Sequence, residues 1–144
     1  MKAKDYMMQV EKLDTIIRNK LVEKAQWMDI SLGVTSQLGG EKVQSSGNQQ
    51  KMANAIERCI DMEAEINALI DRLIDTKKDI IETIEQLNAT EYDVLHKRYI
   101  QHLSYFDIAA IKDRDYNWVT TVHGRALKSV QRILDEREYD ENCL

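Results

Sequence analysis

The chain has no proline and only five glycines among its 144 residues. Without proline, no residue forces a helix to kink or stop, so long helices are favoured. Four of the glycines fall in or beside one stretch rich in serine and glutamine, residues 31–50, which we expect to be a flexible linker. These four are Gly33, Gly39, Gly40 and Gly47.

Cysteine and histidine are also scarce, and their spacing does not suit a metal or redox site. Cys59 and Cys143 are the only cysteines, and without a CxxC pair they argue against structural zinc and against a disulfide framework. The sequence has no P-loop, GxSxG or HExxH motif. We therefore expect a protein that is not an enzyme and has no catalytic residues, metal or cofactor.

Long apolar runs are absent as well. No stretch approaches the roughly 20 apolar residues of a membrane span. Lys2, Lys4 and Asp5 interrupt the apolar run that a signal peptide requires. These features predict a cytoplasmic protein that does not enter a membrane.

Charge is unevenly distributed along the chain. The net charge of −5 disfavours non-specific binding of nucleic acid by the whole surface. Within residues 115–134, however, the only acid is Asp115, whereas Arg125, Lys128 and Arg132 supply positive charge. A basic segment on an acidic chain is typical of a DNA-binding module carried on a separate scaffold.

Apolar residues at helical spacing predict two long helices, at residues 3–30 and 51–88, that form an antiparallel hairpin. The first has its apolar face at Tyr6, Val10, Leu13, Ile17, Leu21 and Met28. The second has one row at a spacing of seven, formed by Met52, Cys59, Ile66, Leu73, Ile80 and Leu87, and another formed by Ile56, Ile70 and Ile84.

The apolar stripe of the second helix is wider than one partner helix can cover. We expect the surplus to form a homodimer, with Ile66, Leu73 and Ile80 near the seam. The alternative is that the C-terminal segment folds back over the surplus and leaves a monomer.

Residues 89–144 predict a separate module of three shorter helices, near 91–101, 104–111 and 115–136. The fold class is therefore all-α, with residues 1–88 as a coiled-coil scaffold. Candidate N-caps are Thr90, Ser104 and Asp115, and Asp107 completes an approximate capping box with Ser104.

The turn before the last helix has Asp113 at its central position, where Asp tolerates a left-handed backbone better than most residues. Ile111 is expected to fill the space beside this turn. The expected core of the module contains Leu95, Tyr99, Phe106 and Ile108, with the histidine at position 123 beside the apolar face of the last helix.

Several pairs of residues in this module form a known pattern: Val94-Leu95, Arg98-Tyr99, Ile108-Ala109, and Val119 followed by Ala126-Leu127. The pattern resembles region 4 of bacterial sigma-70 factors. It is most similar to small sigma-region-4-like proteins of phages and prophages of Gram-positive bacteria, which have a long helical N-terminal half and an ending similar to HGRAL at residues 123–127. KVQSSG at residues 42–47 extends the resemblance more loosely. The sequence departs from the family at Asp113, usually Gly, and at Lys112 and Arg114, usually apolar.

The resemblance implies a sequence-specific transcriptional regulator that binds double-stranded DNA through a helix-turn-helix and contacts RNA polymerase. It also implies that Arg98 points at the phosphate backbone or supports the turn. A complete sigma factor is not expected, because promoter opening needs aromatic side chains that capture unstacked bases. The first ninety residues contain only two aromatic residues, Tyr6 and Trp27.

The recognition helix has a polar face made of Asn117, Thr121, Arg125, Lys128 and Arg132. Asn117 can pair bidentately with adenine, and Thr120 or Thr121 can meet a thymine methyl group. Arg125 can read guanine or hold a phosphate, and Lys128 suits a phosphate contact. Trp118 packs either on the sugar-phosphate backbone or over the module's own core.

A function of another class stays open. The charged turn and the acidic total also suit a helical protein-interaction module that does not bind DNA and acts on a partner such as RNA polymerase.

Overall fold

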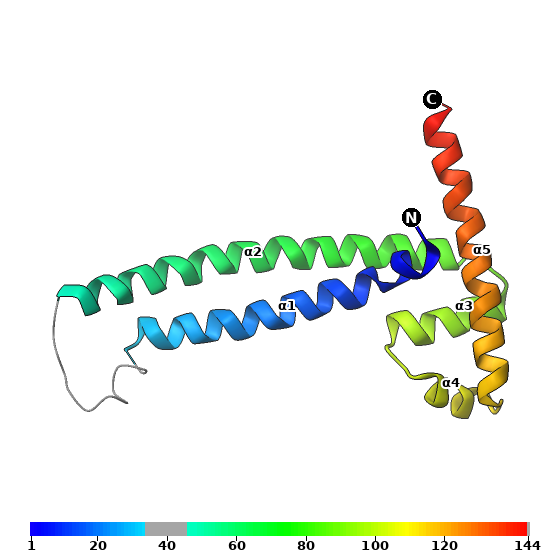
Figure 1. The fold of residues 1–144 in the computed structure, drawn as a ribbon, viewed down its shortest axis with the longest axis horizontal. Coiled ribbons are helices and arrows are strands. Elements are labelled where there is room, and N and C mark those ends of the chain that lie inside the picture. Colours follow the sequence, from blue (N-terminus) through cyan, green and yellow to red (C-terminus); the bar gives the residue numbers. More distant parts are fainter. Residues whose placement is uncertain (34–45, 144) are drawn as a thin grey trace. The chain divides into compact units, whose positions relative to one another are not determined.

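The computed structural model describes residues 1–33 and 46–143, and its regular secondary structure is entirely helical (Figure 1). No strand occurs in the described residues, so the all-α prediction is confirmed. The helices, in chain order, are α1 (Ala3–Ser31), α2 (Ser46–Ile84), α3 (Ala89–Leu95), the π-helical turn η2 (His96–Ile100), α4 (Tyr105–Lys112) and α5 (Tyr116–Asn142).

The boundaries of α2 and α5 differ from the prediction. Residues 46–50, which were assigned to the linker, belong to the first turns of α2. Ser and Gly are tolerated at the start of a helix because its first N–H groups have no partner within the helix. The remainder of the predicted linker lies largely outside the described residues, as does most of the KVQSSG stretch. α2 ends at Ile84 rather than at residue 88, and α5 continues to Asn142 rather than to residue 136.

The N-cap of α3 is Asn88 and not Thr90, the residue that the sequence predicts. Asn88 has an extended backbone, and its side chain accepts a hydrogen bond of 2.9 Å from the backbone N–H of Glu91. Thr90 already lies inside the helix. An N-cap must precede the first helical residue and have non-helical dihedral angles, so Asn88 takes this role.

The chain forms two compact units. The two-helix unit is Leu13–Arg72, and the terminal unit is Met1–Lys12 together with Leu73–Leu144. These units differ from the expected segments, 1–88 and 89–144. The physical reason is that the first turns of α1 and the last turns of α2 contribute to the same core as α3 and α5.

In the two-helix unit, the segments of α1 and α2 run antiparallel. Lys20 Nζ lies 3.1 Å from Glu65 Oε2, and Cys59 Sγ lies 3.8 Å from the carbonyl oxygen of Lys24. The later residue in α1 thus meets the earlier residue in α2. The buried apolar residues of this unit are Leu13, Ile17, Ala55, Cys59, Met62 and Ile66.

The buried face of α2 confirms one predicted row and, of the other, only its last residue. Cys59, Ile66, Ile80 and Ile84 are buried as predicted, but Ile56 is 50% exposed and Ile70 is 38% exposed. The row that contains Ile56 also contains two charged residues at positions 63 and 77. Burying an unpaired charge is far costlier than leaving an isoleucine in water. The second buried row is therefore the charge-free one, formed by Ala55, Met62, Leu69, Thr76 and Thr83, all buried or half-buried.

On α1, the predicted apolar face is correct only for its first half. Leu21 is 49% exposed and Met28 is 45% exposed. The seam follows alternating steps of three and four residues, which lead from Ile17 to Lys20 and Lys24. Both lysines are half-buried, because the long stem of lysine can cover apolar surface while its ammonium group reaches polar partners.

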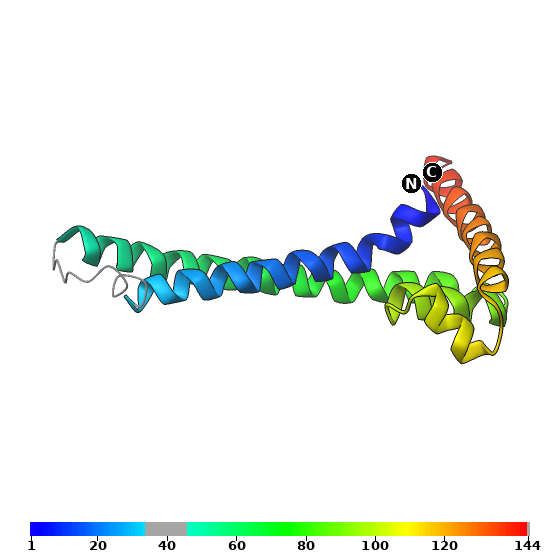
Figure 2. The same ribbon diagram turned by 60° about the horizontal axis from the view of Figure 1, so that its bottom comes forward.

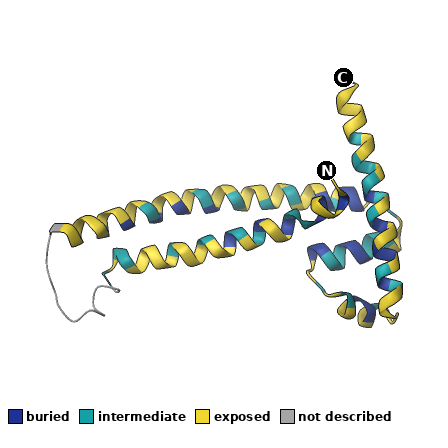
Figure 3. Cartoon of the chain, in the orientation of Figure 1, coloured by how far each residue is buried: buried dark blue, intermediate teal, exposed yellow. Residues whose placement is uncertain are grey.

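The core of the terminal unit joins five segments. It contains side chains from the start of α1, the end of α2, α3, η2 and the middle of α5, and Figure 3 shows these buried positions in dark blue. Its buried members are Ala3, Tyr6, Met7, Val10, Ile80, Ile84, Leu95, Tyr99, Ile100, Ala126 and Val130. Leu95 and Tyr99 are thus core residues, as predicted.

Polar side chains tie both chain ends into this unit. The backbone N–H of Ala3 donates to Gln131 Oε1 at 2.7 Å, and Gln131 Nε2 donates to the carbonyl oxygen of Met1 at 3.1 Å. The Tyr6 hydroxyl lies 2.8 Å from Thr83 Oγ1, which also accepts a 2.7 Å hydrogen bond from Arg137 Nη2. The N-terminus therefore lies beside α5 in both views (Figures 1 and 2).

The residues expected at a dimer seam are covered within the single chain. Ile66 is 5% exposed and Ile80 is 0% exposed, while Leu73 packs partly buried against the core of the terminal unit. They are correctly identified as apolar contact residues but face other helices of the same chain, so they are not available to a second copy.

The two-helix unit gives the first prediction. Met62→Ala removes a fully buried side chain and should lower the free energy of unfolding by about 2–5 kcal/mol. Val22→Ala is the matched control, since Val22 is 58% exposed, and it should change stability by less than about 0.5 kcal/mol. Urea denaturation followed by circular dichroism compares them. Equal effects would contradict the assignment of the buried face.

Candidate nucleic-acid interface

The short helix α4 begins with a complete capping box. Ser104 has an extended backbone, and its hydroxyl accepts a hydrogen bond of 3.1 Å from the backbone N–H of Asp107. The backbone N–H of Ser104 donates in return to Asp107 Oδ2 at 3.4 Å. This reciprocal pair, which the sequence predicted, fixes where α4 starts.

A tight turn joins α4 to α5. Asp113 adopts the left-handed conformation, with φ 53° and ψ 48°, so the predicted role of Asp at this position is confirmed. The backbone N–H of Arg114 donates to the carbonyl oxygen of Ala109 at 3.0 Å and closes the turn. Asp115 then caps α5, accepting a 2.7 Å hydrogen bond from the backbone N–H of Trp118. The carboxylate also complements the positive end of the helix dipole.

A small apolar cluster holds α4 against α5. Its buried members are Val94, Ile108, Ala109, Val119 and Val122, and the partly buried Leu103, Tyr105 and Trp118 pack on it. Ala109 in this cluster provides the small side chain that two closely approaching helices require.

Two residues expected in the module's interior are on the surface. Phe106 is 73% exposed and Ile111 is 59% exposed. The buried face of α4 follows helical spacing through Tyr105, Ile108 and Ala109, and both residues lie off that face. The Phe106 ring instead packs against the ring of Tyr116, with centroids 4.8 Å apart.

The polar face of α5 is open to solvent. Its five residues are all exposed: Asn117, Thr121, Arg125, Lys128 and Arg132. They recur at spacings of three and four residues, so they share one side of the helix. No acidic residue occurs in α5 before Asp135.

Trp118 and Thr120 are engaged within the protein. Trp118 is half-buried on the small apolar cluster, and the Arg114 guanidinium carbon lies 5.1 Å from the centre of its ring. The hydroxyl of Thr120 donates to the carbonyl oxygen of Asn117 at 3.1 Å. Of the two roles expected for Trp118, covering the core is the one that this geometry displays.

Arg98 lies in η2 and contacts the connection to α4. Its Nη1 donates to the carbonyl oxygen of Leu103 at 3.1 Å, and its guanidinium carbon lies 4.8 Å from the centre of the Tyr105 ring. These contacts support the connection before α4, which is a different segment from the turn at Asp113 named in the expectation. The π-helical turn and the left-handed His102, with φ 59°, were not predicted, and the sequence lacks the glycine that would have indicated either.

His123 is buried beside this arginine, as expected of a structural histidine. The Tyr99 hydroxyl lies 2.6 Å from His123 Nε2. Burial, with the nearby positive charges of Arg98 and Lys4, lowers the pKa of His123 to about 4. Burial likewise raises the pKa of Tyr99 to about 12. The pair is therefore neutral at pH 7.

An ion-pair triad joins η2 to α4. Asp93 bonds to Lys97 Nζ at 2.6 Å and also contacts Lys112. Burial opposes ionisation of Asp93, but the hydrogen bonds from Lys112 and Lys97 outweigh it and lower the pKa of this carboxyl. Lys112, which lies directly before the turn, thus has a partner within the protein.

Searches for related proteins found nothing to compare with this site: no family model, no curated protein and no solved structure matches the chain. Across the described residues, no group of three or more histidine, cysteine or acidic side chains is placed to hold a metal ion. No helix of the described chain is long and apolar enough to span a membrane.

The buried histidine predicts a pH dependence of stability. The unfolded chain takes up a proton on His123 below about pH 6.5, whereas the folded protein does so only near pH 4. His123 therefore does not reduce the free energy of unfolding above pH 6.5. As the pH drops from 6.5 toward 4, protonation of His123 in the unfolded chain lowers this free energy by at most roughly 3 kcal/mol. Urea unfolding between pH 7.5 and 4.5 measures the slope.

His123→Gln should flatten this slope, because Gln does not titrate. His96, which is half-buried and whose pKa burial also lowers, supplies the comparison. His96→Gln should leave most of the slope intact. A slope unchanged by His123→Gln would mean that another group titrates.

Proposed function

We propose that this chain is a sequence-specific transcriptional regulator of the phage type that binds double-stranded DNA. In this proposal α4, the turn at Asp113 and α5 form a sigma-region-4-like helix-turn-helix, and α5 is the recognition helix. The residues before α3 then serve as a helical scaffold. The observation that carries the proposal is the solvent-exposed, acid-free face of α5 directly after a tight left-handed turn.

The order of residues along this face suits a recognition helix. Asn117 and Thr121 lie in the first turns, where a recognition helix reaches base edges in the major groove. An asparagine amide can pair with adenine, and a threonine methyl can contact thymine. Arg125, Lys128 and Arg132 follow at phosphate-binding positions further along the helix.

The interior contacts of the module support the same division of roles. Trp118 packs on the cluster between α4 and α5, Arg98 contacts the loop before α4, and the Thr120 hydroxyl bonds within α5, so we assign these three residues structural roles rather than the first contacts with DNA. Asp93 pairs with Lys97 and Lys112, which are half-buried, whereas the exposed basic residues Arg125, Lys128 and Arg132 lie on α5, with Arg114 just before it. Charge placed in this way attracts DNA to one face of an acidic protein.

A second candidate function rests on exposed aromatic surface. The rings of Phe106 and Tyr116 pack against each other at a tilt on the protein surface, and the residues are 73% and 41% exposed. Aromatic side chains of this kind are typical anchors of protein interfaces. They favour a protein-interaction module, and RNA polymerase is the partner that the family resemblance suggests.

Selection of bound sequences from a random DNA pool, using the full purified chain, tests the proposal. DNA binding predicts an enriched consensus, together with heparin retention that falls steeply with salt. Recovery of no consensus, with flow-through on heparin, would reject DNA binding and leave the interaction module.

Base reading by Asn117 is tested on the selected site. Asn117→Ala should cost on the order of 1–3 kcal/mol of binding free energy on that site and little on random DNA. Fluorescence anisotropy with both DNAs measures the two affinities. An equal loss on both would show that Asn117 acts through the fold or the backbone.

Phosphate binding by Arg125 and Lys128 predicts a different pattern. The double variant Arg125→Ala, Lys128→Ala should weaken binding about equally on all sequences and lower the salt slope by roughly one for each phosphate that the protein no longer neutralises. The matched control is Lys51→Ala with Arg72→Ala, two exposed basic residues of α2. A salt slope that stays the same in the first variant would show that neither residue binds a phosphate.

A further inference from the structure

α2 has a second apolar stripe, next to the buried one, that no described residue covers. Ile56, Ile60, Ile70 and Ile74 are 50%, 62%, 38% and 59% exposed. These four isoleucines and the exposed polar residues at positions 63 and 67 form one row along the helix. Successive members of the row are separated alternately by four and three residues, which is the spacing of a coiled-coil seam. Single exposed apolar residues are common, but four in one helical row mark an interaction surface.

The order of side chains along this stripe is symmetric about position 65. Ile56 and Ile74 are equally far from this centre, and so are Ile60 and Ile70. When two copies of α2 lie antiparallel across a two-fold axis at the centre, each isoleucine therefore meets an isoleucine of the other copy. An isologous contact of this type requires such self-complementarity, whereas an unrelated partner does not.

The polar pair at the centre obeys the same symmetry. Glu63 and Asn67 are both exposed and lie two residues on either side of position 65. In the antiparallel pair, Glu63 of one copy faces Asn67 of the other, and the amide of Asn67 can donate to the carboxylate. A polar layer inside an apolar seam fixes register and orientation. A shift by one heptad would instead place these polar groups against isoleucines, where they would lack partners.

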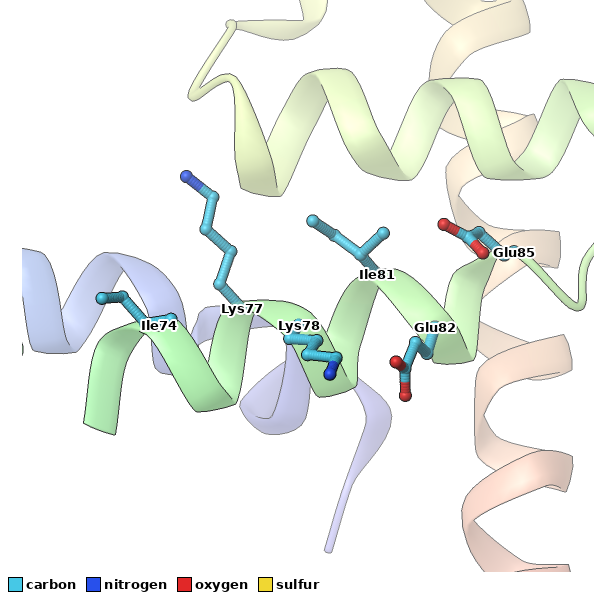
Figure 4. A pocket seen from close by; sticks show the side chains of 6 residues that line it. All are labelled: Ile74, Lys77, Lys78, Ile81, Glu82 and Glu85. Atoms are coloured by element: carbon cyan, nitrogen blue, oxygen red, sulfur yellow. The ribbon is translucent and has the colours of Figure 1, made fainter. Parts of the chain in front are cut away.

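The stripe ends within α2. Lys77 takes the next position after Ile74, and Ile81 beyond it packs partly buried against the core of the terminal unit (Figure 4). These three residues line a shallow hollow together with Lys78, Glu82 and Glu85, and four of its six residues are charged. The free seam is therefore confined to the portion from Ile56 to Ile74, about 27 Å of helix.

We propose that this stripe is the homodimer interface of the protein, formed by antiparallel packing of two α2 helices through Ile56, Ile60, Ile70 and Ile74. This interface uses a different face of α2 from the predicted seam at Ile66, Leu73 and Ile80, which the chain's own helices cover. It is independent of whether the chain binds DNA.

Sedimentation equilibrium of the full chain at micromolar concentration tests the interface. The wild type should sediment at twice 16.8 kDa. Ile60→Glu should give the monomer with an unchanged helical circular dichroism spectrum, because Ile60 is exposed in the single chain. Val22→Glu is the matched control, a similarly exposed apolar residue on α1, and it should remain a dimer. A wild-type monomer, or a dimer that survives Ile60→Glu, overturns the proposal.

Crosslinking tests the orientation. With Cys143 replaced by Ser, Ala64→Cys places a thiol beside the two-fold axis, next to its own copy, whereas Asp71→Cys lies roughly 20 Å from its copy along the seam. Both positions are exposed. A short bismaleimide should link the first variant into a dimer and leave the second unlinked. Linkage at position 71 without linkage at position 64 overturns the antiparallel arrangement.

Charge reversal gives a third readout. The antiparallel pair places Glu57 of one copy beside Asp71 of the other, so two acids repel at each end of the seam. Added salt should therefore tighten the dimer, opposite to its effect on DNA binding. Glu57→Lys should lower the dimer dissociation constant several-fold at low salt. A weaker dimer in this variant contradicts the assigned register.

Discussion

The structure depends on the exclusion of charge from one face of α2. Two candidate rows flank the row of Cys59 and Ile66, and they differ by a single residue in register. The row with Glu63 and Lys77 would bury ionised groups without partners, at a cost of several kcal/mol for each. The row with Ala55 and Met62 contains no charge and is the buried one. This choice decides which side chains meet α1 and which remain in water.

The same choice shapes the terminal unit. Once Ile80 and Ile84 are directed inward, they share a core with the start of α1, with α3 and with the middle of α5. α5 is held along one side by this core and at its start by the cluster around Ile108 and Val119. Its opposite side therefore stays free. A helix anchored in this way presents a rigid row of polar side chains, which is what recognition of a regular surface such as a DNA groove requires.

Hydrogen bonds and ion pairs within this unit fix how η2, α4 and α5 are placed against one another, which apolar packing alone does not specify. The π-helical turn adds one residue to the path of the chain between Leu95 and Gln101 and brings Tyr99 to His123 and Arg98 to the loop before α4. Asp93 then ties Lys97 and Lys112 together across the same junction. Each group is a donor or acceptor whose partner comes from another element, and for the buried Tyr99–His123 pair removal of one partner leaves a buried polar atom unsatisfied.

By itself the sequence determined the features that arise from local chemistry. The helix spans follow from periodicity and the lack of proline, the cap of α4 from Ser104 and Asp107, and the turn from an Asp that tolerates a left-handed backbone. Tertiary structure decided the rest. Whether Ile56 or Ala55 is buried, whether Phe106 is inside, and which partners Lys112 and Arg98 find all depend on helices distant in the chain. Neighbouring rows of one helix are equivalent in periodicity, and only the partner surface distinguishes them.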